Sequence, residues 1–335
     1  MRTIITGGAG FIGSHLTEAL LAQGDEVVVL DDISTGSLAN LAAVEGHPRL
    51  SIVEGSVLDR GLVTALVRGT DRVFHLAAAV GVKLIVEQPL DGLRVNIHGT
   101  ENVLEAALDA AARLVTLSTS EIYGKNTADR LGEESDSVLG SPLKSRWSYA
   151  AAKSIDECFA SAYHRQLGLA VTIVRLFNTV GPRQTGRYGM VVPNLVGQAL
   201  RGEPLTVFGD GLQTRCFSYV LDVVPALVRL SESRETIGQA YNLGGAQEIS
   251  IIDLARRVIR VLGSASEIEL VPYERAYADG YEDMRRRVPD NSKAAAAVGF
   301  EPTTDIDRII LAVADELKGS GRGREDVMSL AGEVT

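Results

Sequence analysis

A glycine-rich segment near the start of the chain is the feature that most restricts how it can fold. Residues 6–13 read Thr-Gly-Gly-Ala-Gly-Phe-Ile-Gly, follow an apolar pair and lead into an amphipathic helical pattern. Because Gly7, Gly10 and Gly13 lack side chains, the backbone can turn tightly, approach a pyrophosphate and pack the helix on the strand. The segment therefore predicts a strand, a phosphate loop and a helix that together bind a dinucleotide.

An acidic residue at the end of the next strand distinguishes between two dinucleotides. The run Val27-Val28-Val29-Leu30 predicts this strand, and Asp31 stands at its carboxyl end. A carboxylate about 20 residues beyond the glycines accepts hydrogen bonds from the adenosine ribose and repels a 2′-phosphate. The sequence therefore predicts NAD rather than NADP as the cofactor.

Strands and helices then alternate regularly as far as Leu176. The patterns predict strands at 50–54, 72–76, 114–117 and 171–176, with helices at 58–67, within 89–111 and at 149–167. This alternation is typical of a doubly wound parallel sheet. We therefore expect an α/β chain built on a Rossmann parallel sheet.

The length of 335 residues suggests two domains. Glycines and prolines interrupt the alternation from Gly181, and the pattern resumes near Phe217. We expect an NAD-binding domain from residues 1–177 plus 217–243, a smaller, discontinuous α/β substrate-binding domain from 178–216 plus 244–317, and a flexible tail at 318–335.

Composition argues against several functions. The net charge is −10 and the densest basic run is only Arg285-Arg286-Arg287, so no nucleic-acid partner is expected. Cys158 and Cys216 are too few for a disulfide framework or a metal site, and we expect both to be buried and no metal to be bound. No apolar run approaches the length of a membrane span, and a strand that starts at residue 2 leaves no room for a signal peptide. A cytoplasmic protein without a membrane partner is expected.

Tyr149 and Lys153 form the first candidate catalytic pair. They are four residues apart at the start of a helical pattern, so their side chains lie on one face. A tyrosine acts as a base near neutral pH only beside positive charge, which Lys153 and a nicotinamide ring would provide by lowering its pKa. A pair at this spacing is also common on helix surfaces, so a second signal is needed.

That second signal is a cluster of polar residues where the strand near 114–117 ends. Ser118, Thr119, Ser120 and Glu121 follow this strand, and open α/β sheets bind ligands at the carboxyl ends of their strands. A threonine hydroxyl can bond the substrate hydroxyl that is oxidised, and Glu121 can act as an acid or base at a neighbouring carbon.

Taken together, these segments resemble the extended short-chain dehydrogenase/reductase family of nucleotide-sugar epimerases, dehydratases and decarboxylases. The resemblance reaches about Pro302 and rests on TGGAGFIG, HLAA, STSEIYG, SYAAAK, RLFNTVGPR and VFGDGLQTRCFSYVLDVV. It implies that Tyr149 is the base, that Lys153 tunes it and holds the ribose, and that Thr119 polarises the sugar hydroxyl. It also implies a homodimer in which helices within 96–111 and 149–167 form a four-helix bundle.

The resemblance further assigns contacts along the chain. It implies cofactor contacts at Gly7, Gly10, Phe11, Ile12, Gly13, Asp31, Asp32, Ser34, Thr35, Gly36, Ser56, Val57, Leu76, Ala77, Ala78, Ser118, Tyr149, Lys153 and Phe177, with Ser56 standing where the family commonly has Asp. It implies nucleotide-sugar contacts at Val80, Lys83, Thr119, Ser120, Glu121, Tyr149, Asn178, Arg187, Val192, Thr206, Val207, Phe208, Arg215, Arg287 and Asp290. Within this set, Asn178 and Arg215 would contact the diphosphate, and Arg287 the pyrophosphate or a sugar carboxylate.

The resemblance leaves three outcomes open after oxidation at sugar C4, namely epimerisation, decarboxylation and dehydration. Ser120 stands where the dehydratases carry an acidic Asp, which argues against dehydration. Thr119-Ser120-Glu121 matches the UDP-glucuronate decarboxylases, whereas SYAAAK is closer to the epimerases than to the YDEGK of those decarboxylases.

A uronate carboxylate held by Arg187 and Thr185, or by Arg183, would resist leaving. We therefore expect a UDP-glucuronate 4-epimerase that recycles NAD. The alternatives are a UDP-xylose-forming UDP-glucuronate decarboxylase, then a UDP-glucose 4-epimerase, and more remotely a non-catalytic NAD sensor.

Overall fold

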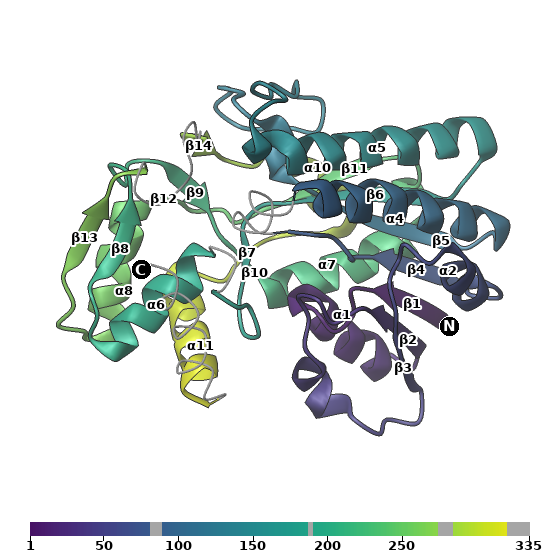
Figure 1. The fold of residues 1–335 in the computed structure, drawn as a ribbon, viewed down its shortest axis with the longest axis horizontal. Helices are drawn as coiled ribbons and strands as arrows, with labels where there is room; N and C mark the ends of the chain where they lie inside the picture. Colours follow the sequence, from purple (N-terminus) through teal and green to yellow (C-terminus); the bar gives the residue numbers. More distant parts are fainter. Residues whose placement is uncertain (81–88, 187–189, 274–283, 320–335) are drawn as a thin grey trace.

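The molecule has a larger and a smaller part, and a seven-stranded parallel sheet is the centre of the larger one (Figure 1). The computed structural model describes residues 1–80, 89–186, 190–273 and 284–319. The strand order is β11-β6-β5-β4-β1-β2-β3, and every neighbouring pair is parallel. The strands are β1 (Arg2–Thr6), β2 (Glu26–Asp31), β3 (Leu50–Glu54), β4 (Arg72–His75), β5 (Arg113–Thr119), β6 (Val171–Leu176) and β11 (Ala240–Leu243). The doubly wound sheet predicted from the sequence is confirmed.

Helices cover both faces of this sheet. One face carries α1 (Phe11–Ala22) and α7 (Val220–Glu232), which pack against each other, and the other carries α2 (Arg60–Val67), α4 (Pro89–Asp109) and α5 (Ser148–Leu167). Alternate residues of β1 divide between the two layers, since Ile5 joins the α1/α7 core and Ile4 the other. The central strands are therefore buried on both faces, as parallel sheets require.

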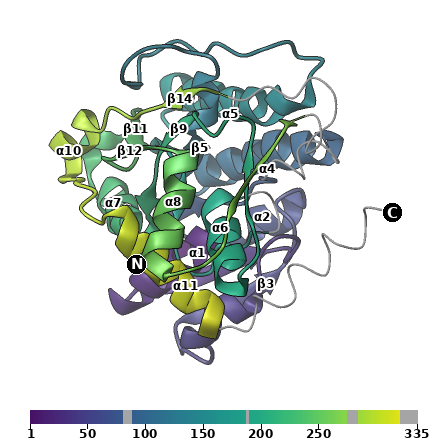
Figure 2. The ribbon, with the colours of Figure 1, turned by 90° about the vertical axis from the view of Figure 1, so that its left-hand side faces the viewer.

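A smaller α/β part lies beside the carboxyl ends of the strands (Figures 1 and 2). Its core is formed by helices on a short parallel ladder: α6 (Val191–Arg201), α8 (Ile251–Leu262), α11 (Ile306–Gly319), β8 (Leu205–Phe208) and β13 (Ile268–Val271). Two small sheets join it to the larger part: β12 (Glu248–Ser250), β9 (Thr214–Cys216) and β14 (Arg286–Arg287) in one, β7 (Thr179–Val180) and β10 (Ser218–Tyr219) in the other.

One segment packs on a different part from the one expected. Helix α10 (Ser292–Val298) falls within the range assigned to the substrate-binding domain, but Ala294 and Phe300 are buried in the core formed by α1 and α7. Its apolar side chains cover α7 and the edge strand β11. This segment belongs to the larger part, and the remaining domain limits stay predictions.

Two expectations from composition can also be compared with the structure. Cys216 is buried, but Cys158 is exposed on α5, so the expectation that both would be buried is wrong for Cys158. Its place on the helix follows from the turn geometry, which puts it on the solvent side while Tyr149, Lys153 and Asp156 face inward. Within the described ranges, no helix has both the length and the hydropathy to cross a bilayer.

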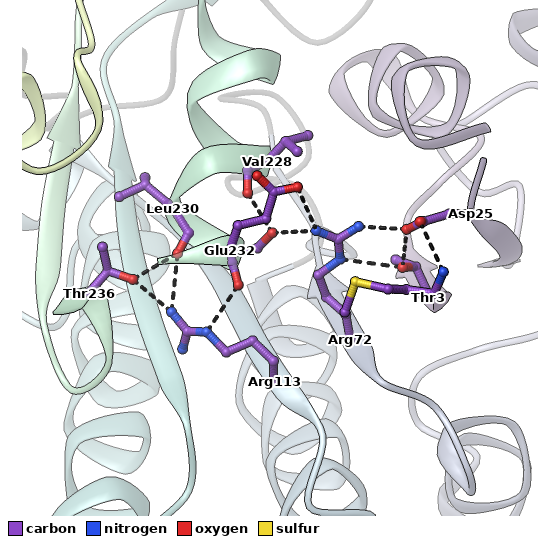
Figure 3. A network of polar contacts seen from close by, with 10 residues as sticks. Thr3, Asp25, Arg72, Arg113, Val228, Leu230, Glu232 and Thr236 are labelled. Atoms are coloured by element: carbon purple, nitrogen blue, oxygen red, sulfur yellow. Dashed lines mark hydrogen bonds and ion pairs between the residues drawn. The ribbon is translucent and has the colours of Figure 1, made fainter. Parts of the chain in front are cut away.

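A buried polar network closes the amino-terminal edge of the sheet (Figure 3). Arg72 is 1% exposed, and its Nη2 lies 2.5 Å from Asp25 Oδ2. Burial alone would raise the pKa of Asp25, but hydrogen bonds from Thr3 and Arg72 outweigh burial and hold that pKa below its ordinary value. Arg113, at the start of β5, donates to Thr236 Oγ1 at 2.7 Å. This edge is filled by interactions that hold the fold together, and ligands are expected at the opposite edge.

Candidate active site

The glycine loop forms a cradle that no other residue type fits. Gly10 caps the amino end of α1 with backbone alone, and the first turn of α1 has no acidic side chain. Gly7 has φ +72°, and a Cβ there would lie 2.7 Å from the amide nitrogen of Ala77; a Cβ on Gly13 would collide with the carbonyl oxygen of Gly7. These residues fit a dinucleotide, because a bare helix amino terminus binds a pyrophosphate.

Asp31 lies beside this loop at the carboxyl end of β2. Its Oδ2 accepts the amide of Ala9 and its Oδ1 the amide of Ile33, both at 2.9 Å. Burial raises the pKa of Asp31, although these hydrogen bonds oppose the change. Next to it, Asp32 Oδ1 accepts both the amide and the hydroxyl of Ser34. The Asp31 carboxylate is thus fixed next to the glycine loop. If that loop binds the pyrophosphate of NAD, the adenosine ribose would lie near Asp31.

Two of the predicted cofactor residues turn their side chains into the protein core. Val57 packs on Gly99 in the core beneath α4, and Phe177 is fully buried against Tyr123. Ser56 uses its hydroxyl to accept the amide of Leu58 at 3.2 Å. The side chains of Val57 and Phe177 pack in the core, and their contacts with a cofactor stay predictions.

The candidate base lies in the first turn of α5. Tyr149 is 9% exposed and hydrogen-bonds Thr119. Burial raises its pKa, the negative charges of Glu121 and Asp156 raise it further, and the hydrogen bond to Thr119 opposes them. The lowering expected from Lys153 together with a nicotinamide ring stays a prediction. Lys153 Nζ is paired with Asp156 Oδ2 at 2.8 Å.

Glu121 is clamped between two arginines. Glu121 lies in the short helix η2 (Ser120–Tyr123), which Thr119 caps. Its Oε2 lies 2.6 Å from Arg146 Nη1, and its Oε1 lies 2.6 Å from Arg287 Nη1. Burial would raise its pKa, but Arg287 and Arg146 outweigh burial and lower the pKa to about 2. At neutral pH Glu121 is a carboxylate, so its expected role as a proton donor is corrected.

Arg287 joins this cluster to the smaller part of the molecule. It donates to Ser120 Oγ at 3.3 Å and to Asn178 Oδ1 at 3.2 Å. Arg215 lies opposite Arg287 in the register of β9 and β14, and both are buried. Arg146, Arg215 and Arg287 therefore gather three guanidinium groups near Glu121, and such groups are suited to bind carboxylates and phosphates.

Several predicted substrate residues have other surroundings. Val192 and Val207 are buried in the core of the smaller part, so their side chains face away from a ligand. On the opposite face of β8, Thr206 bonds Gln198 and Phe208 is half-buried. Asp290 accepts the amide of Ser292 at the start of α10. Contacts of Val192 and Val207 with a substrate stay predictions.

The loop residues expected near a uronate lie in different places. Arg183 Nη2 lies 2.5 Å from Glu18 Oε1 on α1, and its role in holding a uronate stays a prediction. Arg187 and Lys83 lie outside the described residues. Val80 is exposed at the end of a described range.

Two charged residues of the site escaped the sequence analysis. Arg146 lies three residues before Tyr149, and Asp156 lies three residues after Lys153. The spacing of Lys153 and Asp156 is the usual one for an ion pair on a helix and was the available signal. Arg146 is in the turn before the helix, where no periodicity marks its direction.

The parallel sheet, the glycine cradle and the Thr119, Tyr149 and Lys153 set define an extended short-chain dehydrogenase/reductase that uses NAD. The family model described as GDP-mannose 4,6 dehydratase matches residues 4–313, and the chain belongs to this family. UDP-N-acetyl-alpha-D-glucosaminuronate decarboxylase of Bacillus cytotoxicus is 40% identical over 302 residues, which cover 90% of this chain and 92% of that protein. UDP-glucuronic acid decarboxylase 1 of Xenopus tropicalis is 38% identical, over 91% of this chain and 69% of that protein.

Solved structures support the same class. The dTDP-glucose 4,6-dehydratase DesIV from Streptomyces venezuelae, with NAD and TYD bound, has a TM-score of 0.87 and 31% identity, covering 97% of this chain and 100% of that one. The UDP-glucuronic acid 4-epimerase from Bacillus cereus, in complex with UDP-glucuronic acid and NAD, has a TM-score of 0.86 and 28% identity, covering 96% and 100%. The chain is an NAD-dependent enzyme of the nucleotide-sugar-modifying type.

Proposed function

We propose that the chain is an NAD-dependent decarboxylase of a UDP-hexuronate. The observation that carries this proposal is its identity of 40% and 38% to two proteins named as decarboxylases of such sugars. The 4-epimerase expected from the sequence is not favoured by these relatives and becomes the second candidate. It is supported by the SYAAAK segment and by the structural likeness to a UDP-glucuronic acid 4-epimerase.

The proposed reaction begins at the sugar C4 hydroxyl. Thr119 orients this hydroxyl and Tyr149 removes its proton, while Lys153 holds the ribose. Bound NAD supplies the chemistry of accepting a hydride from C4 and returning it. The C6 carboxylate then lies β to the C4 ketone, so the bond from C5 to C6 breaks, carbon dioxide leaves and C5 gains a proton. Hydride return to C4 gives a UDP-pentose.

The arginine cluster supports an anionic sugar in this proposal. Arg146, Arg215 and Arg287 gather guanidinium groups at the site, and guanidinium groups suit a diphosphate or a uronate. Dehydration, in contrast, needs an acid that protonates a departing hydroxyl. Ser120 has no acidic proton to give, and Glu121 is ionised at neutral pH.

The test is to incubate the protein and NAD with UDP-glucuronate and, separately, with UDP-N-acetylglucosaminuronate. Proton NMR and carbon dioxide release are followed, with the Tyr149→Phe variant as the control. A pentose product with carbon dioxide supports the decarboxylase and identifies its sugar. A C4 epimer that retains C6 establishes the second candidate, and turnover of neither sugar would reject a uronate substrate.

We also propose that the enzyme is a homodimer through α4 and α5. These helices lie side by side, and each exposes a large apolar residue, Leu90 on α4 and Ile155 on α5. A partner subunit would cover such residues. Light scattering of the wild type and of Ile155→Glu tests this interface. A dimer that dissociates in the variant supports it, and a wild-type monomer contradicts it.

A further inference from the structure

A buried ion pair on the catalytic helix has no assigned part in the proposed reaction. Lys153 Nζ lies 2.8 Å from Asp156 Oδ2, and both side chains are 2% exposed. Charges buried this deeply are costly unless they are paired. Tyr149, Lys153 and Asp156 are spaced by four and three residues, so all three lie on one face of α5. Asp156 therefore fixes the ammonium group of the lysine on the face that carries the tyrosine.

A chain of buried polar side chains adjoins Asp156. Its first member, Thr100 on α4, acts to lower the pKa of Asp156. His75 Nε2 lies 3.0 Å from Thr100 Oγ1, and His75 Nδ1 lies 2.7 Å from Thr6 Oγ1. Thr6 is the residue before the glycine loop, and all four of these residues are buried. This row of buried polar groups runs from the surroundings of Asp156 to the residue before the cofactor loop.

The charges around Tyr149 and Lys153 come from three elements. Glu121 faces the tyrosine from η2, Asp156 faces both residues from the next turn of α5, and His75 faces the lysine from β4. Burial lowers the pKa of His75 to about 3, so it is neutral near pH 7. Glu121 is already paired with two arginines. Glu121 and Asp156 are thus both negative charges that act on Tyr149, and Asp156 is the one that is paired with Lys153.

We propose that Asp156 is a positioning residue for the oxidation step. It fixes Lys153 beside Tyr149 and offsets the charge of the lysine, so that the tyrosine keeps its proton until the positively charged nicotinamide lies beside it. This inference rests on the proposed function in one respect, the role of Tyr149 as the base. Removing the charge of Asp156 leaves Lys153 to stabilise the tyrosinate.

The experiment measures the ionisation of Tyr149 directly. The protein is labelled with carbon-13 at tyrosine Cζ and titrated by NMR with and without NAD, the Tyr149 signal being assigned from the Tyr149→Phe variant. Asp156→Asn is expected to lower the titration midpoint of Tyr149 by about one pH unit or more, since a like charge nearby raises a pKa by that order. Asp156→Ala replaces it in the same test if the asparagine variant does not unfold cooperatively.

Glu157→Gln is the matched control. It removes the neighbouring carboxylate, which is paired with Arg175 at 2.6 Å, and leaves the Lys153 pair intact. It is expected to lower thermal stability without moving the Tyr149 midpoint. A midpoint that stays at its wild-type value or rises in both neutral Asp156 variants overturns the proposal. Because this titration does not require turnover, absence of a sugar product would count against the proposed function alone.

Discussion

Glu121 lies between Arg146 and Arg287, and this position fixes its charge. Its pKa of about 2 is below the ~4.3 of an unfolded glutamate, so ionised Glu121 stabilises the folded state above the unfolded pKa. That contribution, about 3 kcal/mol by linkage, is lost as the pH falls from about 5 toward 2. We predict that the difference in unfolding free energy between wild type and Glu121→Gln narrows over this range. Urea titrations at several pH values measure it, and a constant difference would contradict the assignment.

Arg287 allows a sharper test of geometry. It bonds Ser120, Glu121 and Asn178 at once, which a lysine with a single ammonium group cannot reproduce. We predict that Arg287→Lys lowers kcat/KM by about 10- to 100-fold, the order expected for losing a charge-assisted hydrogen bond.

The neighbouring arginine supplies the control for this prediction. Arg286 is half-exposed and is paired with Glu248 of β12, the strand on the other side of β9 in this sheet. Arg286→Lys is expected to leave kcat/KM within about twofold of the wild type, because exposed pairs contribute little. Equal losses of kcat/KM in Arg286→Lys and Arg287→Lys would contradict the prediction. They would mean that any change in strand β14 lowers activity, whether or not the buried guanidinium of Arg287 is removed.

At the scale of elements, the glycine loop depends on the absence of side chains. We predict that Gly13→Ala abolishes detectable NAD binding by calorimetry, because the added Cβ would collide with the carbonyl oxygen of Gly7. Gly61→Ala, inside α2 with only ordinary contacts, is the control. It should bind NAD normally and gain about 0.5–1 kcal/mol in stability, as replacing glycine in a helix does. Retained NAD binding in Gly13→Ala would show that the loop can rearrange.

Local elements were predictable and the charge pairs were not. The sequence patterns of β3 and β6 predicted the observed bounds. For β6 the reason is that a buried parallel strand has a short apolar run between turns. The glycine spacing likewise predicted its loop. The partners of Arg146 and Arg183 are far away in the sequence, and only tertiary packing brings Glu121 and Glu18 to them. The pKa of Tyr149 is raised because the side chain is buried. The four-residue spacing between Tyr149 and Lys153 in the sequence does not indicate burial.

At the scale of the molecule, stability and chemistry occupy opposite edges of the sheet. We predict that Asp25→Asn lowers the unfolding free energy by about 3–5 kcal/mol, the usual cost of breaking a buried ion pair, and leaves the KM for substrate unchanged. Glu26→Gln, which removes only an exposed pair with Arg2, should cost less than about 1 kcal/mol. Urea unfolding and kinetics of both variants measure this, and an altered KM in Asp25→Asn would show that the two edges are coupled.

The pairing of α1 with α7 has a consequence for synthesis on the ribosome. Leu16 and Leu20 are covered by Val223 and Leu227, which are translated about 200 residues later. Until then, a nascent chain long enough to form six strands carries an uncovered apolar layer, and such surfaces recruit chaperones or aggregate. A fragment of residues 1–178 should therefore bind a hydrophobic dye and elute as an aggregate, whereas the full chain should not. The core between α1 and α7 is therefore complete only after most of the chain has been made, and the nascent chain can aggregate until then.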